Sequence, residues 1–257
     1  MNVLMIEVME LLHSFMWPFV RVSAVLVSAP IFSTTSLNLP TRIAIGAVLT
    51  LLLFPNVAVP DIDPFSFGAL EGLFHEVTVG LLMGVSLQVV TVAIILAGQS
   101  IAGGMGLGMA NMVDPNLGNV PTVSQFLLII CLLVFLSLGG HLILLTILSD
   151  SFTYIPIAQG ILQGDMLDQF IAWSAQMFVG AAALALPIMM GLLMINVCLG
   201  VISRASPALN IFAVGFPALI PLGFGMLIVT LSVLVGRIEG LWFDAFRYLQ
   251  SALGMTA

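Results

Sequence analysis

The chain has 257 residues, of which 61% are hydrophobic and only 7% are charged. A soluble domain is usually about a quarter charged, so this composition excludes an ordinary water-soluble domain. Lipid or other apolar helices must surround most of the chain. Because no polar block is long enough to form a separate domain, we expect a single membrane unit over residues 1–257.

The formal net charge is −7, from twelve acidic residues and five basic residues, all of them arginine. Nucleic acids require clustered Lys and Arg side chains, so this charge excludes nucleic acid as a partner. Cys131 and Cys198 lie inside apolar runs without CxxC or Cys/His spacing. In this setting we expect both cysteines to act as small hydrophobic residues, not as a disulfide or as metal ligands. We expect no metal and no cofactor.

Both ends of the chain predict short amphipathic helices. The first carries Glu7 and Glu10 and no Lys or Arg before Arg21, so we do not expect a cleavable signal peptide. Its apolar residues recur at helical spacing: Leu4, Val8, Leu11 and Phe15. The C-terminal stripe has the same spacing: Ile238, Trp242, Phe246, Leu249 and Leu253. We expect both segments to lie at an interface or against partner helices.

Six apolar stretches between these ends predict helices, each near the ~20 residues that cross a bilayer. They are Phe15–Phe32, Ile43–Val59, Val77–Ala102, Phe126–Leu148, Gln176–Ile202 and Ile211–Val235. Prolines within them favour kinks, and Gly80-x-x-x-Gly84 allows a neighbouring helix to approach closely. The predicted fold class is all-α: a membrane-associated bundle of apolar, kinked helices or hairpins with short amphipathic terminal helices.

Two polar residues inside apolar stretches are candidate sites. An arginine deep in a bilayer costs about 2.5–3.5 kcal/mol on insertion scales, so Arg21 should have a partner. We expect a structural pair with a carboxylate or with carbonyls, in this chain or in a neighbouring subunit. His141 lies beside Gly139 and Gly140. This favours a hydrogen bond to a neighbouring helix over a proton relay.

Two patterns resemble catalytic or ligand motifs, and both are incomplete. His75-Glu76 would need a second histidine at position 79 to form a zinc-protease motif, and that position is Val79. Gly104-x-Gly106-x-Gly108 lacks the strand, turn and lysine of a phosphate-binding loop. We therefore expect no enzymatic activity.

The segment 103–125, GGMGLGMANMVDPNLGNVPTVSQ, separates two strong apolar stretches. Glycine and proline interrupt a helix here, and methionine supplies soft, adaptable apolar surface. Two interpretations stay open, an ordinary exposed connection and a loop that closes a pore. The second interpretation assigns gating to these residues: Met105, Gly106, Leu107, Gly108, Met109, Met112, Asp114, Pro115 and Pro121.

Several motifs occur in the order found in one protein family. They are Arg21-Val-Ser-Ala, Ala29-Pro30-Ile31-Phe32, Leu39-Pro40-x-Arg42, Glu76-x-x-x-Gly80-x-x-x-Gly84, the glycine-rich run ending in Asp114-Pro115, and Ser203-Arg204-x-x-Pro207-x-x-Asn210-Ile211-Phe212-x-x-Gly215-x-Pro217. Together they cover roughly the whole chain. They resemble the FliR family of flagellar export proteins, which also includes a subunit of virulence-type injectisomes.

This resemblance implies a subunit of the core export gate of the flagellar type III secretion apparatus, in the bacterial inner membrane at the basal body. Its partners would be FliP-like and FliQ-like membrane subunits, other membrane proteins of the apparatus and lipid. Unfolded flagellar polypeptides would be its substrates. In this family the apparent spans are bent hairpins in a helical assembly, and the loop at Met105–Pro121 acts as a plug.

Structural or inter-subunit roles are expected for two groups of residues. The family motifs supply Arg21, Pro30, Arg42, Arg204, Asn210 and Phe212. The C-terminal stripe supplies Trp242 and Phe246, and replacing both with Ser should weaken assembly if this stripe is a partner surface.

Two rival functions remain. A self-contained secondary transporter for a small solute would need an inverted repeat and a polar site near the middle of the membrane. Only Arg21 and His141 are candidate coupling groups for such a transporter. An intramembrane enzyme would need a nucleophile or a metal set. Purification separates these functions, because a transporter should be stable without other subunits, whereas a gate subunit should need its partners.

Overall fold

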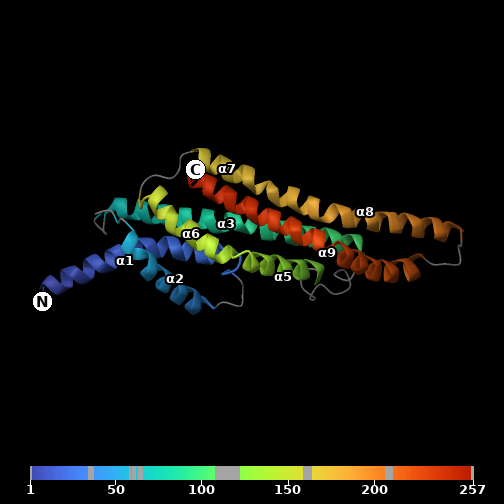
Figure 1. Ribbon diagram of the computed structural model, residues 1–257, viewed down its shortest axis with the longest axis horizontal. Coiled ribbons are helices and arrows are strands. Elements are labelled where there is room, and N and C mark those ends of the chain that lie inside the picture. Colours follow the sequence, from blue (N-terminus) through green and yellow to red (C-terminus); the bar gives the residue numbers. More distant parts are fainter. Residues whose placement is uncertain are drawn as a thin grey trace. The chain divides into compact units, whose positions relative to one another are not determined.

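The computed structural model describes residues 2–33, 38–57, 59, 62, 66–107, 122–158, 164–205 and 211–255. Every regular element in these ranges is helical (Figure 1), which confirms the predicted all-α fold class. The helices are α1 (Asn2–Ser28), α2 (Leu39–Leu53), the 3₁₀ helix η1 (Phe54–Asn56), α3 (Phe67–Gly104), α5 (Thr122–Ser137), α6 (Gly140–Tyr154), α7 (Gly164–Ser174), α8 (Gln176–Ala205) and α9 (Ile211–Ala252).

The chain packs as two compact units. Unit 1 comprises residues Met1–Val89, Gly139–Ser174 and Phe243–Ala257, and unit 2 comprises Val90–Leu138 and Ala175–Trp242. The fully buried residues of unit 1 include Trp17, Val25, Met83, Leu87 and Leu148. Those of unit 2 include Ile94, Phe135, Ile188, Leu192 and Trp242. Each unit therefore has its own apolar core, although α3 and α9 contribute residues to both.

Three stretches of helix in the described residues are long and apolar enough to cross a membrane. They are Phe67–Gly104, Leu167–Ala205 and Ala218–Ala252. The pair α5 and α6, which is broken between Ser137 and Gly140, would make a fourth. Together with the composition, these helices make the chain a membrane protein. The described residues therefore contain three or four helices that are both long and apolar enough to span a membrane, fewer than the six predicted stretches.

Both amphipathic terminal segments are continuous with apolar helices. α1 passes through Pro18 without interruption, and α9 extends through the C-terminal stripe to Ala252. A continuous helix satisfies its backbone hydrogen bonds internally, whereas a break in apolar surroundings would leave several groups without partners. Because a continuous helix leaves no such backbone groups without partners, the amphipathic segments are not separate helices.

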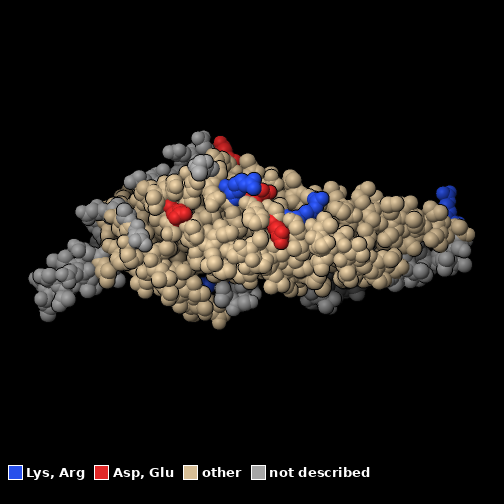
Figure 2. Space-filling view, in the orientation of Figure 1, with Lys and Arg blue, Asp and Glu red and all other residues tan. Residues whose placement is uncertain are grey.

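The surface matches the composition. Figure 2 shows acidic and basic side chains only at scattered points on a face formed mainly by other residues. Large apolar side chains remain exposed along α8, among them Phe178, Val179, Met190, Leu193, Met194 and Val201. Others are exposed along α9, among them Phe224, Ile228, Val229 and Val233. Contiguous apolar surface of this kind marks contact with lipid or with other subunits.

Candidate functional site

One face of α3 forms a seam with α1 in unit 1. The residues of this seam recur every four positions: Gly72, Glu76, Gly80, Gly84 and Gln88. Residues four apart lie on one face of a helix. A Cβ at Gly72 would lie 2.7 Å from the Trp17 ring. At the other end, the Gln88 amide donates to the Ser28 carbonyl at 2.7 Å, where α1 ends.

Gly80 and Gly84 allow α1 and α3 to approach closely. A Cβ at Gly80 would lie 2.6 Å from both the Ala24 Cβ and the Arg21 carbonyl oxygen. A Cβ at Gly84 would overlap the Ser28 hydroxyl and would lie 2.7 Å from the Ala29 nitrogen. Backbone atoms cannot rotate away as a side chain can. The close approach predicted from this GxxxG pattern is therefore confirmed.

Arg21 and Glu76 form a bidentate ion pair in the middle of this seam. The Arg21 Nε donates to Glu76 Oε2 at 2.7 Å, and Nη2 donates to Oε1 at 3.0 Å. Both side chains are 0% exposed. The planar guanidinium matches the geometry of a carboxylate. Such matching is needed because two buried charges are costly unless they are paired and hydrogen-bonded.

The other Arg21 donors bind the C-terminal end of α6. Nη1 donates to the Ser151 carbonyl at 3.0 Å and to its hydroxyl at 3.2 Å, and Nη2 donates to the Ile155 carbonyl at 3.0 Å. All five N–H groups of the guanidinium thus have acceptors. The Phe152 ring centroid lies 4.4 Å from the guanidinium carbon. Since a helix C-terminus carries partial negative charge, Arg21 connects α1, α3 and the end of α6 favourably.

Glu76 also contacts the segment that follows α6. The Ala158 N–H donates to Glu76 Oε1 at 3.4 Å. The φ angle of Ala158 is +60°, in the left-handed region that costs a non-glycine residue roughly 1–2 kcal/mol. The carboxylate helps to offset this strain. One acidic side chain therefore contacts both α1 and the turn after α6.

This arrangement holds helices together and offers no reactive group. The charges of Arg21 and Glu76 face each other away from solvent, so neither meets the geometric needs of a general acid or base. Among the described residues, no group of three or more His, Cys, Asp or Glu side chains could hold a metal ion. The ring nitrogens of His75 are buried without a hydrogen-bond partner, as is Nδ1 of His141. No described acceptor or donor connects either histidine to a relay.

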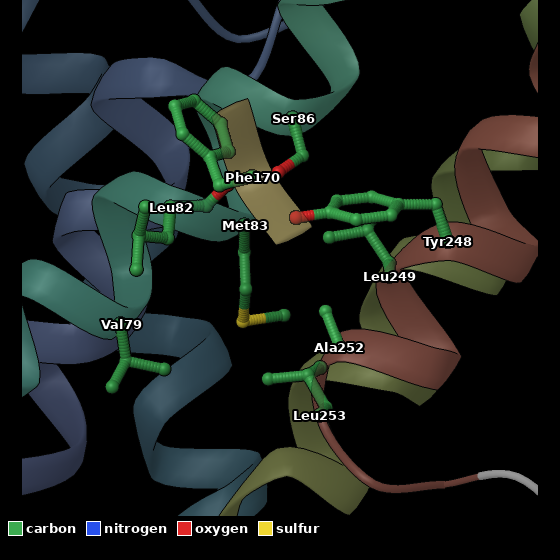
Figure 3. Close-up of a pocket in the computed structure, with 9 residues that line it drawn as sticks. All are labelled: Val79, Leu82, Met83, Ser86, Phe170, Tyr248, Leu249, Ala252 and Leu253. Atoms are coloured by element: carbon green, nitrogen blue, oxygen red, sulfur yellow. Dashed lines mark hydrogen bonds between the residues drawn. The ribbon is translucent and has the colours of Figure 1, made fainter. Parts of the chain in front are cut away.

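Unit 1 also contains a partly open apolar pocket between α3, α7 and the end of α9. Its volume is about 330 Å³, including space open to solvent. It is lined by Val79, Leu82, Met83, Ser86, Phe170, Tyr248, Leu249, Ala252 and Leu253 (Figure 3). Figure 3 shows the Tyr248 hydroxyl directed towards Ser86. Trp173 stacks on Tyr248 at 4.8 Å and donates to the Ser86 carbonyl at 2.9 Å, which joins α7 to α3.

The glycine-rich segment begins with a defined helix stop. The Leu107 N–H donates to the Ala102 carbonyl at 3.0 Å, and the Gly106 N–H donates to the Gly103 carbonyl at 3.0 Å. These two bonds form a Schellman motif. The motif requires a left-handed residue, and Gly106 supplies it with φ of +80°. α3 therefore ends where glycine was predicted to interrupt it.

Met105, the first residue assigned to the plug, lies inside the core of unit 2. Its side chain is 0% exposed. It packs against α9 at Gly223, where a Cβ would lie 2.5 Å from the Met105 Cε. Met105 therefore packs within unit 2 at the point where the glycine-rich segment begins. Gly106 and Leu107 are half-buried, and the other predicted plug residues lie outside the described residues: Gly108, Met109, Met112, Asp114, Pro115 and Pro121.

The start of α5 is also held against α3. The Ser124 hydroxyl donates to the Ile95 carbonyl at 3.1 Å. A Cβ at Gly98 would lie 2.5 Å from the Ser124 Cα. Glycine is thus needed at position 98 for the backbones of α3 and α5 to come this close.

The predicted motif residues occupy varied positions. Pro30 is buried in the turn after α1, and Arg42 is half-buried in the first part of α2. Arg204 is exposed in the last turn of α8, where a cation is favourable to the helix dipole. Asn210 lies outside the described residues. Phe212 lies in the first turn of α9, and its side chain is not among those described.

Trp242 and Phe246 are interior residues, which favours the structural role over the inter-subunit role among the two expected for them. Trp242 is 0% exposed and Phe246 is 5% exposed. The Trp242 Nε1 donates to the Cys131 carbonyl at 3.2 Å, and its ring contacts that of Phe135 at 4.6 Å. A surface for a partner requires exposed side chains. The burial of these residues places them in the core of this chain instead.

The sequence interpretation missed the other half of the ion pair. Glu76 was noted only as a motif position, and Ser151 was not noted at all. One signal was available, since Glu76 is a carboxylate four residues before Gly80 on the face predicted to meet another helix. Ser151 had no such signal, because its contribution depends on the end of α6.

The chain is similar in sequence to known bacterial proteins. Residues 12–245 match the family described as bacterial export proteins, family 1. The flagellar biosynthetic protein FliR of Pectobacterium carotovorum subsp. carotovorum is 33% identical over 96% of this chain and 95% of its own length. The FliR proteins of Escherichia coli (strain K12) and Bacillus subtilis (strain 168) are each 30% identical, over 93% and 97% of this chain and 92% and 99% of their own lengths. The resemblance to the FliR family is confirmed, and the chain belongs to the bacterial export proteins, family 1.

Proposed function

We propose that this chain is a subunit of the flagellar export apparatus. Together with FliP-like and FliQ-like membrane subunits, it forms a gated channel for unfolded flagellar polypeptides in the bacterial inner membrane at the basal body. The observation that carries this proposal is the match to proteins named FliR over more than nine-tenths of both lengths. A match over nearly the whole chain favours the same role in the same assembly.

The exposed apolar faces of α8 and α9 support a role as a subunit. Ile228 and Val229 of α9 are 73% and 80% exposed, and Met194 of α8 is 69% exposed. Monomeric proteins in water rarely expose contiguous apolar patches of this extent. Neighbouring subunits, other membrane proteins of the apparatus and lipid would cover these faces. The chain would contribute passage and sealing, without chemistry on the substrate.

Sealing would be the role of the connection between α3 and α5. We assign the plug to Gly106–Pro121 and exclude Met105, because Met105 is buried against Gly223. The glycines and methionines of Gly106–Pro121 suit a segment that must yield to many different passing chains. The helix stop at Gly106 sets where this segment begins.

The ion pair argues against the rival function of a stand-alone solute transporter. Such a transporter needs a charged group that can bind or release its coupling ion. Arg21 instead has all of its donors bound to Glu76, Ser151 and Ile155. His141 is the other candidate, and no described group connects it to Arg21.

Co-expression with FliP-like and FliQ-like subunits from the same bacterium tests the proposal. The tagged complex is purified in detergent, and its mass is measured by native mass spectrometry. We expect one defined hetero-oligomer that contains this chain, together with poor recovery when the chain is expressed alone. A stable particle that contains only this chain would overturn the proposal and favour the transporter.

A further inference from the structure

The structure fixes both ends of the connection between α3 and α5 within unit 2. At the first end, the Schellman motif stops α3 and leaves Met105 as the C-cap residue. The Met105 side chain is fully buried, and its Cγ would lie 2.6 Å from a Cβ at Gly223 of α9. A Cβ at the adjacent Gly104 would lie 3.2 Å from the Leu192 Cδ1 of α8.

At the second end, Ser124 of α5 packs directly against α3. Its side chain is 0% exposed, and its hydroxyl donates to the carbonyl of Ile95, one turn before Gly98. The absence of a side chain at Gly98 lets the Ser124 backbone make this contact. Val123 beside it is 1% exposed. Thr122 begins α5, so the helix is held at its first turn.

These contacts require glycine at Gly98 and at Gly223. The same helices also contain glycines at which an added Cβ would meet no neighbouring atom. In α9, a Cβ at Gly225 would meet nothing within 4 Å, in contrast to Gly223 two residues earlier. In α3, a Cβ at Gly103 would also meet nothing within 4 Å, in contrast to Gly98. Within unit 2, tight contacts therefore mark both ends of the connection, as Gly72, Gly80 and Gly84 mark the seam of α3 with α1 in unit 1.

We propose that Met105 and Ser124 are positioning residues that stay in place throughout export and anchor the α3–α5 connection on Gly223 and Gly98. The inference rests on the proposed export function. Buried, closely packed side chains resist displacement because interiors are packed like molecular crystals. A passing polypeptide would then act on the connection without separating α3, α5 and α9.

A reversible cross-link tests whether the first anchor stays in place. Cys131 and Cys198 are first replaced by alanine, and Met105→Cys is combined with Gly223→Cys. A sulfur at position 105 would lie near the Cβ at position 223, within the reach of a disulfide. The matched control combines Met105→Cys with Gly225→Cys. The complex is oxidised in cells, the linked peptides are identified by mass spectrometry, and secretion of flagellar proteins is measured before and after reduction.

We expect the 105–223 pair to cross-link and the 105–225 pair to remain unlinked. Export should continue at an unchanged rate in the cross-linked complex. Absence of the 105–223 cross-link would overturn the anchor contact. A loss of export on oxidation that reduction restores would show that Met105 must leave Gly223, which also overturns the proposal.

Gly98→Ala tests the other anchor, because its Cβ would lie 2.5 Å from the Ser124 Cα and force the start of α5 away from α3. We expect it to lower the thermal unfolding midpoint of the complex, whereas the matched control Gly103→Ala, whose Cβ meets nothing within 4 Å, should not. Equal midpoints would overturn the second anchor, and this comparison also serves if the 105–223 variant fails to assemble. The proposed function has a separate criterion. If deletion of the gene for this chain leaves flagellar secretion intact, the export role fails, whereas the cross-links still decide whether the anchor contacts exist.

Discussion

The guanidinium of Arg21 and the carboxylate of Glu76 meet in a bidentate pair from which solvent is excluded on both sides. The two residues are 55 positions apart, and the pair fixes the seam between α1 and α3. Ser151, 130 positions from Arg21, brings the end of α6 to the same point. A single arginine thus joins three helices of unit 1.

Removal of one partner of this pair should be costly because the other charge stays buried. We expect Arg21→Met to lower the free energy of unfolding by about 3–5 kcal/mol. In the double variant Arg21→Met/Glu76→Leu no buried charge is left, so most of this loss should be regained. The thermal unfolding midpoint of the purified complex in detergent measures both effects.

Ser151→Ala is the graded control for this pair. It removes one hydroxyl acceptor at 3.2 Å and leaves the Ser151 carbonyl acceptor at 3.0 Å. We expect a loss of about 0.5–1.5 kcal/mol, the usual contribution of one hydrogen bond. If the double variant proved less stable than Arg21→Met, burial of the lone carboxylate would not be the main cost.

Alanine substitution at two glycines of α3 should change stability in opposite directions, because only one of them lies in the close contact with α1. Replacement of a helical glycine by alanine normally stabilises a helix by roughly 0.5–1 kcal/mol. Gly103→Ala should show this gain because its Cβ meets nothing within 4 Å. Gly84→Ala should instead lower the unfolding midpoint, since the new Cβ would strike the Ser28 side chain and the Ala29 nitrogen. Equal effects at the two positions, measured in the same detergent, would contradict the tight seam.

The sequence was sufficient for the helices and for the Gly80–Gly84 contact, since both follow from local periodicity. It was insufficient for the partner of Arg21. Other acidic residues, among them Asp63 and Glu71, lie in the same part of the sequence, and only the packing of α1 on α3 selects Glu76. Ser151 and Ile155 act through carbonyls at the end of α6, and no residue type predicts such an acceptor.

The apolar patterns at Trp242 and Met105 show a different limit. An apolar stripe predicts which face of a helix is covered, but it cannot say whether the same chain or a partner covers it. The structure covers Trp242 with Cys131 and Phe135 and covers Met105 with α9. Both side chains therefore lie in the interior of this chain, which for Trp242 favours the structural role over the inter-subunit role.

The interior position of Trp242 leads to a prediction about stability. Trp242→Ser should lower the free energy of unfolding by about 3–5 kcal/mol, as large-to-small core substitutions do. Trp242→Phe keeps most of the apolar volume and loses the hydrogen bond to Cys131, so its loss should be smaller. Phe243→Ser is the matched control, because Phe243 is 50% exposed.

The amount of chain and its co-purification with partners separate the two roles for Trp242. A core residue predicts that Trp242→Ser reduces the amount of the chain itself, even when its partners are present in excess. A normal amount of chain that fails to bind its partners would instead restore the expected partner surface. Phe243→Ser should leave the amount of chain unchanged.

Replacement of residues 108–121 by a Gly/Ser linker of equal length tests the proposed plug and keeps both anchors. The linker lacks Met109, Met112 and both prolines, so it should seal the channel poorly. We expect the complex to assemble normally and to admit small ions or dyes, measured as dye uptake by cells or as ion flux in liposomes. Deletion of Met105–Pro121 should leak as well, but it should also destabilise the complex because it removes the Met105 contact with Gly223. Unchanged permeability in the linker variant would remove the plug hypothesis. A leak without loss of assembly would assign sealing to residues 108–121 and would leave structural support to the anchors at Met105 and Ser124.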